Sequence, residues 1–257
     1  RSDEAVCFSS AASESMRTIA LDQPIRVVAH GIPQLAVAKA EHVRTIQQRF
    51  EDRPIVLALG FIHPDKGADV LIDAAHLLAA SNLEPSPVLL IAGSVRARQG
   101  VFKLKGRSDY AHHRELRKRA ASVPGGFVQF TDYVSANELP ALLAATTIAV
   151  LPYRAGTQSG IASHTLAAAL PVVASDLIGL REQLGKSAKY VPIGNAPALA
   201  QAIENLLTDS EAREKLRRHA QLYEIALTTQ WSLPTSFLES AKRSAERQTD
   251  GGLVAQA

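Results

Sequence analysis

The stretch TIAVLPYRAGTQSGIASH, residues 147–164, runs in order through a strand pattern, a polar loop and a helix pattern. Residues 147–151 form an apolar run of strand character, and a helix is predicted over residues 161–170, after a loop with two glycines. A helix that starts just beyond the carboxyl end of a buried strand points unpaired N–H groups into the crevice at the sheet edge. That arrangement favours an anion such as a diphosphate. An ordinary strand–helix connection capped by Ser159 is the alternative.

The composition is that of a soluble globular protein, with 46% hydrophobic and 21% charged residues in 257. This length allows one large domain or one and a half. The net charge of +3 is small, and a pI near 9.1 permits acidic ligands without indicating a nucleic-acid partner. Cys7 is the only cysteine, which excludes a disulfide framework and a cysteine-based zinc site. No apolar run reaches the roughly 18 residues of a membrane span, so we expect a cytoplasmic protein. The chain begins with Arg1, not with Met, which leaves open that it is a fragment.

Strand and helix patterns alternate regularly from residue 55 onward. Strands are predicted at residues 55–59, 88–92, 127–130, 147–151, 171–174 and 189–192, and helices at 66–80, 109–121, 136–145, 161–170, 180–184 and 196–207. Upstream we expect strands at 5–9 and 25–29 and helices at 13–21 and 36–50, and downstream helices at 210–227 and 236–247. Continuous β-branched runs alternating with helices predict an α/β fold, a doubly wound parallel sheet with extra C-terminal helices. The basic segment 96–107 is expected to be a solvated loop.

Ligands of open α/β sheets bind outside the carboxyl ends of the strands, where two further loops are unusual. In residues 60–67, Gly60 ends a strand and Lys66 is expected to open a helix. A cation at a helix N-terminus is electrostatically misplaced unless it serves a bound anion, although a plain surface lysine is the alternative. In the second loop, Tyr133 and Val134 are placed to flank a nucleobase or simply to pack.

Other kinds of site lack their usual signals. His30, His63 and His164 do not have metal-ligand spacing, so we expect no metal site. The chain has no nucleophile elbow, no P-loop and no dinucleotide-binding fingerprint after a strand. The sequence therefore does not favour a hydrolase, a kinase or a dehydrogenase.

Four segments, in order and with similar spacing, resemble the C-terminal, donor-binding domain of family 4 (group 1) glycosyltransferases of the GT-B fold. They are HGIP at 30–33, GFIHPDKGAD at 60–69, NELPALL at 137–143, and residues 157–182, which open with the variant Thr-Gln-Ser-Gly. The resemblance covers roughly residues 25–225. It implies a Rossmann-like domain that binds a nucleotide-diphosphate sugar and transfers the sugar, with retention of configuration, to an acceptor in polysaccharide biosynthesis. No metal or other cofactor is implied.

The resemblance also implies roles for individual residues. Lys66 would neutralise the donor diphosphate, and the amides around Ser159, Gly160 and Ile161 would hold phosphate or sugar. Tyr133 and Val134 would lie near the base.

This chain departs from the family at several of these positions. Many members have an arginine where this chain has Phe61, and glutamates where it has Gly156 and His164. The second glutamate typically holds the ribose hydroxyls, which His164 can also reach by a hydrogen bond. Arg154 is a candidate for the missing cation, with a surface role as the alternative. Gln158 adds an amide partner in the same loop.

The same comparison divides the chain. Residues 1–24 would be a remnant of the N-terminal acceptor domain, 25–53 an interdomain segment, 54–208 the nucleotide-sugar domain, 209–247 C-terminal helices, and 248–257 a disordered tail. We therefore expect exposed apolar surface and little transfer activity without an N-terminal domain or partner chain. Peripheral association with the inner face of the membrane belongs to the same expectation.

Three hypotheses follow. The first is the donor-binding half of a hexosyltransferase-type glycosyltransferase; the second is a non-catalytic nucleotide-sugar-binding module or truncated pseudoenzyme. The third is a flavodoxin-like or epimerase-type α/β protein with another phosphate ligand. The catalytic residues, sugar, base, acceptor and oligomeric state stay open.

Overall fold

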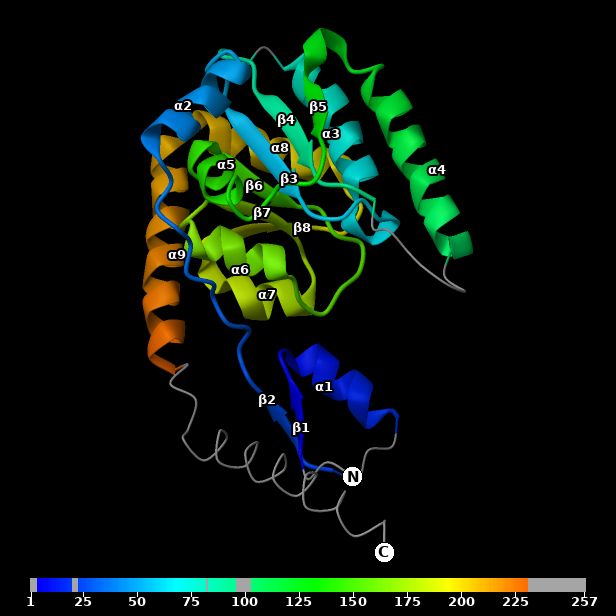
Figure 1. The fold of residues 1–257 in the computed structure, drawn as a ribbon, viewed down its shortest axis with the longest axis vertical. Helices are drawn as coiled ribbons and strands as arrows, with labels where there is room; N and C mark the ends of the chain where they lie inside the picture. Colours follow the sequence, from blue (N-terminus) through cyan, green and yellow to red (C-terminus); the bar gives the residue numbers. More distant parts are fainter. Residues whose placement is uncertain (1–3, 20–22, 82, 96–102, 231–257) are drawn as a thin grey trace, which may run out of the picture.

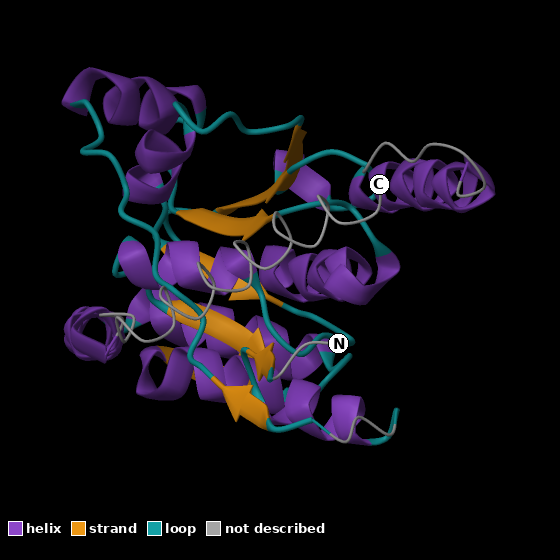
Figure 2. Cartoon of the chain, turned by 60° about the horizontal axis from the view of Figure 1, so that its bottom comes forward, coloured by secondary structure: helices purple, strands orange, loops and turns teal. Residues whose placement is uncertain are grey.

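The computed structural model describes residues 4–19, 23–81, 83–95 and 103–230 (Figure 1). The helix predicted at 236–247 and the predicted disordered tail lie outside these residues. Within them, no helix combines the length and the apolar content needed to cross a membrane. A six-stranded sheet with helices on both faces forms the main body, and a small N-terminal unit lies beside it (Figure 1, Figure 2).

All strands of the main sheet are parallel. They are β3 (Ile55–Leu59), β4 (Val88–Ala92), β5 (Val128–Thr131), β6 (Ile148–Leu151), β7 (Val172–Ser175) and β8 (Ala188–Val191), each within one residue of its predicted range. Their spatial order is β5-β4-β3-β6-β7-β8, so the direction of winding reverses between β3 and β6. The predicted doubly wound sheet is therefore confirmed, with its topological switch point between these two strands.

Both faces of this sheet are buried, which explains the continuous apolar runs of its strands. Val56 packs into a core under α3 (Ala68–Ala80), α4 (Lys103–Ala120) and α8 (Ala196–Thr208). Its neighbours Ile55 and Leu57 point to the other face, because side chains alternate along a strand. That face carries α2 (Ala40–Arg49), α5 (Leu139–Ala145), α6 (Gly160–Ala167), α7 (Ile178–Leu184) and α9 (Ser210–Gln230).

The residues that the structure describes also include the short 3₁₀ turns η1 (Pro64–Lys66), η3 (Pro124–Gly126) and η4 (Gly185–Ser187). The first corrects the prediction that a helix begins at Lys66. Lys66 ends the turn, and Gly67, with a φ of 65°, separates it from α3. The predicted basic loop is also wrong in part, since α4 already begins at Lys103.

The N-terminal unit is a βαβ arrangement of its own. β1 (Ala5–Cys7) pairs in parallel with β2 (Ile25–Val27), and α1 (Ser10–Arg17) connects them. The unit contacts α7, where the Ser10 amide donates to Glu182 Oε2 at 2.9 Å. Val6, Phe8 and Val27 are exposed. The division of the chain into domains stays a prediction.

Candidate functional site at the switch point

The loops that follow β3 and β6 meet at the carboxyl edge of the sheet. The Arg154 amide donates to the Asp65 carbonyl oxygen at 2.8 Å, which joins the two loops directly. A Cβ at Gly67 would lie 1.8 Å from the Pro152 carbonyl oxygen, so only glycine permits this approach. Two loops that the sequence singled out separately therefore form one structure.

Lys66 is the cation of this structure. Its Nζ lies 3.8 Å from the centroid of the Tyr153 ring, and its side chain is half-buried. Burial lowers the pKa of the Lys66 ammonium, and the nearby Asp65 carboxylate opposes that shift only in part. Among the described residues, none forms an ion pair or hydrogen bond with Lys66 Nζ. Lys66 thus offers a partly desolvated positive charge to an anionic ligand.

The N-terminus of α6 lies beside this lysine, through Tyr153. The Tyr153 hydroxyl is 3.0 Å from Ser159 Oγ, and Ser159 caps the helix by accepting from the Ala162 amide. Burial raises the pKa of Tyr153 to about 12, so this hydroxyl stays protonated. The described residues provide no hydrogen bond to the amides of Gly160 and Ile161. These two amides are available to an anion, whereas the Ser159 amide, which was predicted together with them, already donates to Gln183 Oε1.

Gln183 of α7 holds the start of α6 in place. Its Oε1 accepts from the Ser159 amide at 2.9 Å, and its Nε2 donates to the Ser159 carbonyl oxygen at 2.8 Å and to Ser163 Oγ at 2.9 Å. Sequence reasoning missed this residue. The only signal was its place three residues after Leu180 on the buried side of the helix.

The remaining predicted residues of this region lie around Lys66 and the start of α6. Arg154 is exposed and pairs with Asp69 Oδ2 at 2.5 Å, so its charge is already partly balanced. The Gln158 amide oxygen is buried without a hydrogen-bond partner among the described residues. His164 Nδ1 lies 2.7 Å from the Gly160 carbonyl oxygen, one helical turn away.

Gly60, directly after β3, lies next to the start of α6. A Cβ built on Gly60 would lie 3.5 Å from the Ile161 side chain, so the glycine and the helix start are close neighbours. The cavity that Gly60 lines together with Lys66 and Tyr153 has a volume of only about 20 Å³. A ligand of the size of a nucleotide must therefore lie over these loops and not beneath them.

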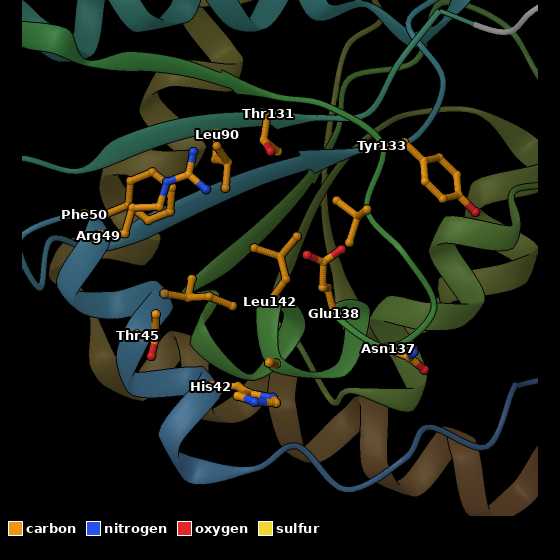
Figure 3. Close-up of a pocket in the computed structure, with 13 residues that line it drawn as sticks. His42, Thr45, Arg49, Phe50, Leu90, Thr131, Tyr133, Asn137, Glu138 and Leu142 are labelled. Atoms are coloured by element: carbon orange, nitrogen blue, oxygen red, sulfur yellow. The ribbon is translucent and has the colours of Figure 1, made fainter.

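Tyr133 and Val134 line a different cavity, of about 390 Å³, between α2, α5 and the strands β4 and β5 (Figure 3). Its other lining residues are His42, Thr45, Ile46, Arg49, Phe50, Leu90, Thr131, Asn137, Glu138, Ala141 and Leu142. Tyr133 itself is 69% exposed at the rim. None of these lining residues belongs to the two loops that contain Lys66 and Ser159. The structure therefore does not bring Tyr133 and Val134 together with those loops.

The described residues contain no group of three or more His, Cys, Asp or Glu side chains placed to hold a metal ion. Ahead of α5, the Ser135 hydroxyl donates to Glu138 Oε2 at 2.7 Å and the Ser135 amide donates to the same oxygen at 3.0 Å. Both bonds lower the pKa of Glu138.

Similar proteins were found in sequence and in structure. Alpha-D-kanosaminyltransferase of Streptomyces kanamyceticus is 31% identical over 172 residues, which are 66% of this chain and 40% of that protein. D-inositol 3-phosphate glycosyltransferase of Jonesia denitrificans is 30% identical over 179 residues, 66% of this chain and 39% of that protein. The chain thus spans about two fifths of the length of these relatives.

Solved structures share the fold at lower identity. HepE of Anabaena, solved in complex with UDP and glucose, has a TM-score of 0.74 at 18% identity, covering 89% of this chain and 61% of that one. Sucrose-phosphate synthase of Thermosynechococcus elongatus has a TM-score of 0.70 at 21% identity, covering 98% and 59%. The model of the family "Glycosyl transferases group 1" matches residues 53–209, which include the whole main sheet and both loops of the site. The chain belongs to the group 1 glycosyltransferases and has their GT-B, Rossmann-like fold.

Proposed function

We propose that this chain is the donor-binding half of a glycosyltransferase, which transfers a hexose from a nucleotide-diphosphate sugar to an acceptor with retention of configuration. One observation carries the proposal: a partly desolvated lysine, which forms no ion pair with any residue that the structure describes, lies beside an open helix N-terminus at the topological switch point. The relatives are named as enzymes of glycosyl transfer, and the structural neighbour HepE was solved with UDP and glucose.

The chemistry of the group suits a diphosphate. The Lys66 ammonium supplies a full positive charge, and the Gly160 and Ile161 amides supply donors backed by the partial charge of the helix end. Hydrogen bonds to charged groups contribute about 1.5–3 kcal/mol each. The same groups would stabilise the negative charge that develops on the leaving diphosphate when the bond to the sugar breaks.

Calorimetric titration of the chain with UDP, GDP and their glucose conjugates tests the donor site. We expect binding of at least one nucleoside diphosphate, weakened by salt because the contacts are ionic. If none binds to the folded chain, the donor-binding proposal is wrong.

Transfer itself is tested by joining the chain to the N-terminal domain that the proposal requires. The enzyme should then release nucleoside diphosphate from the donor, and NMR should show that the product keeps the anomeric configuration of the donor. Inversion of that configuration would contradict the proposed reaction. A cytoplasmic place of action in polysaccharide biosynthesis, at the inner face of the membrane, is part of the same proposal.

A non-catalytic nucleotide-sugar-binding module is the second candidate. It is favoured by Gly156, in the loop before α6, and by His164, in α6, because neither residue supplies a carboxylate to the site. Donor binding without turnover in the joined protein would select this candidate. Activity gained by His164→Glu would show that the missing carboxylate was the reason.

A further inference from the structure

A buried chain of hydrogen bonds connects the segment that leaves the N-terminal unit to the start of α6. His30 Nδ1 lies 2.8 Å from Ser163 Oγ, which accepts from Gln183 Nε2 at 2.9 Å. Gln183 in turn holds the Ser159 amide and carbonyl. We infer that His30 and Gln183 are positioning residues for the anion site, through which the segment after β2 fixes the open amides of α6. This inference rests on the proposed function only for the identity of the anion.

The orientation of the Gln183 amide is determined by its partners. Both hydrogens of Nε2 are used, one toward the Ser159 carbonyl and one toward the Ser163 hydroxyl, while Oε1 accepts from the Ser159 amide. A flipped amide would set donor against donor at Ser159. Gln183, Ser159 and Ser163 are 9%, 5% and 1% exposed, so water has little access to these bonds. The Gln183 side chain therefore fixes the backbone of the residue just before Gly160 and Ile161.

The His30 ring has a determined hydrogen position as well. The Gly31 carbonyl oxygen lies 2.9 Å from His30 Nδ1, and a carbonyl oxygen can only accept. This contact places a hydrogen on Nδ1, which is then shared with Ser163 Oγ at 2.8 Å. Ser163 Oγ accordingly receives hydrogen bonds from both His30 and Gln183.

The N-terminal unit determines where His30 lies. The Phe8 ring, directly after β1, packs on the His30 ring with centroids 5.5 Å apart. A cavity of about 250 Å³, lined by both rings and by Gln183, Glu182 and Tyr223, lies where the unit meets α7. The junction is thus loosely packed, and polar contacts such as those of His30 and of Ser10 with Glu182 carry much of it. A shift of the unit would withdraw the His30 bond from Ser163 and loosen the Gln183 contacts beyond it.

The test uses the full 257-residue chain, with two readouts. The first is exchange of the Ser159 amide hydrogen, measured by NMR without ligand; the second is affinity for UDP. Gln183→Leu should speed exchange and weaken UDP binding by about tenfold each, since it removes both bonds between the Gln183 side chain and the Ser159 backbone. His30→Ala and Ser163→Ala, two bonds or more from the anion site, should shift both readouts in the same direction by about threefold. His30→Asn, whose side-chain amide nitrogen can replace Nδ1, should restore both.

Coupling decides between positioning and a merely structural role. The double variant His30→Ala/Ser163→Ala should equal Ser163→Ala alone, because both changes remove the same link. Gln201→Leu, an exposed glutamine on α8, is the matched control and should change neither readout. If His30→Ala and Ser163→Ala leave Ser159 exchange within a factor of 1.5 of wild type, the inference is wrong, whether or not Gln183→Leu folds. If exchange responds but wild type binds no UDP, the positioning holds and the proposed donor does not.

Discussion

Replacement of Lys66 by methionine removes the charge of the site and keeps an unbranched stem over the Tyr153 ring. Two unit charges 4 Å apart attract by about 4 kcal/mol at the effective dielectric constant of 20 that suits a partly buried site. Lys66 is only half-buried, so solvent reduces this figure toward the 1.5–3 kcal/mol of a charged hydrogen bond. We therefore expect Lys66→Met to weaken binding of UDP by about 1–3 kcal/mol, or roughly 5- to 150-fold in Kd.

We expect a larger loss of binding free energy than an exposed lysine would give, because the Lys66 ammonium is already partly desolvated before the anion binds. Lys66 is half-buried, so folding has already removed part of the water around its charge, and this burial is the cause of its lowered pKa. Binding of the anion then need not remove that water again, and more of the attraction appears as affinity.

Isothermal titration with UDP measures the effect, and Lys118→Met is the matched control. Lys118 is an exposed lysine of α4, so its replacement changes the net charge equally without touching the two loops. The control should bind UDP within twofold of wild type. Equal Kd values for the two variants, at melting temperatures near that of wild type, would refute the assignment of Lys66 to the anion site.

Three further outcomes are expected. The affinity of the wild-type protein for UDP should fall as the pH rises through the Lys66 pKa, which lies below the ordinary 10.5, and should stay flat in Lys66→Met. Between the folded and the unfolded pKa of Lys66, the unfolded chain binds more protons than the folded chain. The free energy of unfolding of the ligand-free protein should therefore rise with pH in this range, which urea titration would detect. Tyr153→Phe removes the hydroxyl bond to Ser159 and should lower the free energy of unfolding by about 0.5–1.5 kcal/mol in urea titrations. Gly67→Ala brings a Cβ within 1.8 Å of the Pro152 carbonyl at a positive φ, and should cost about 2–4 kcal/mol in the same assay.

The strands of the main sheet could be predicted because burial on both faces leaves a local trace. Ile55, Val56 and Leu57 are all fully buried, two on one face and one on the other, and the run is therefore apolar without interruption. The place of the candidate site could be predicted in the same way, since its two loops follow such strands. Their adjacency, however, comes from the reversal of winding between β3 and β6, which no local pattern records.

What could not be predicted depends on partners far away in the sequence. The spacing of Gln183 from Leu180 indicates the buried side of the helix but not its partners, which are the backbone of Ser159, 24 positions earlier, and the Ser163 hydroxyl. The break between Lys66 and α3 exists because Gly67 must clear the Pro152 carbonyl, 85 residues on. The charge of residues 96–107 predicts a solvated loop, yet α4 begins within this segment, at Lys103, and lysine and arginine are good helix formers.

Arg154 and Lys66 are both cations of the site, and the structure separates their roles. Turning Arg154 toward a phosphate would gain a charged hydrogen bond but would break its pair with Asp69. The other oxygen of that carboxylate, Oδ1, is already buried without a partner among the described residues, and the Asp69 side chain is only 20% exposed. Leaving both oxygens unpaired would cost about as much as the phosphate bond gains, 1–3 kcal/mol. Lys66 loses only its contact with the Tyr153 ring, worth about 0.5–1 kcal/mol. The anion should therefore draw on Lys66 first, while Arg154 keeps Asp69 neutralised beside it.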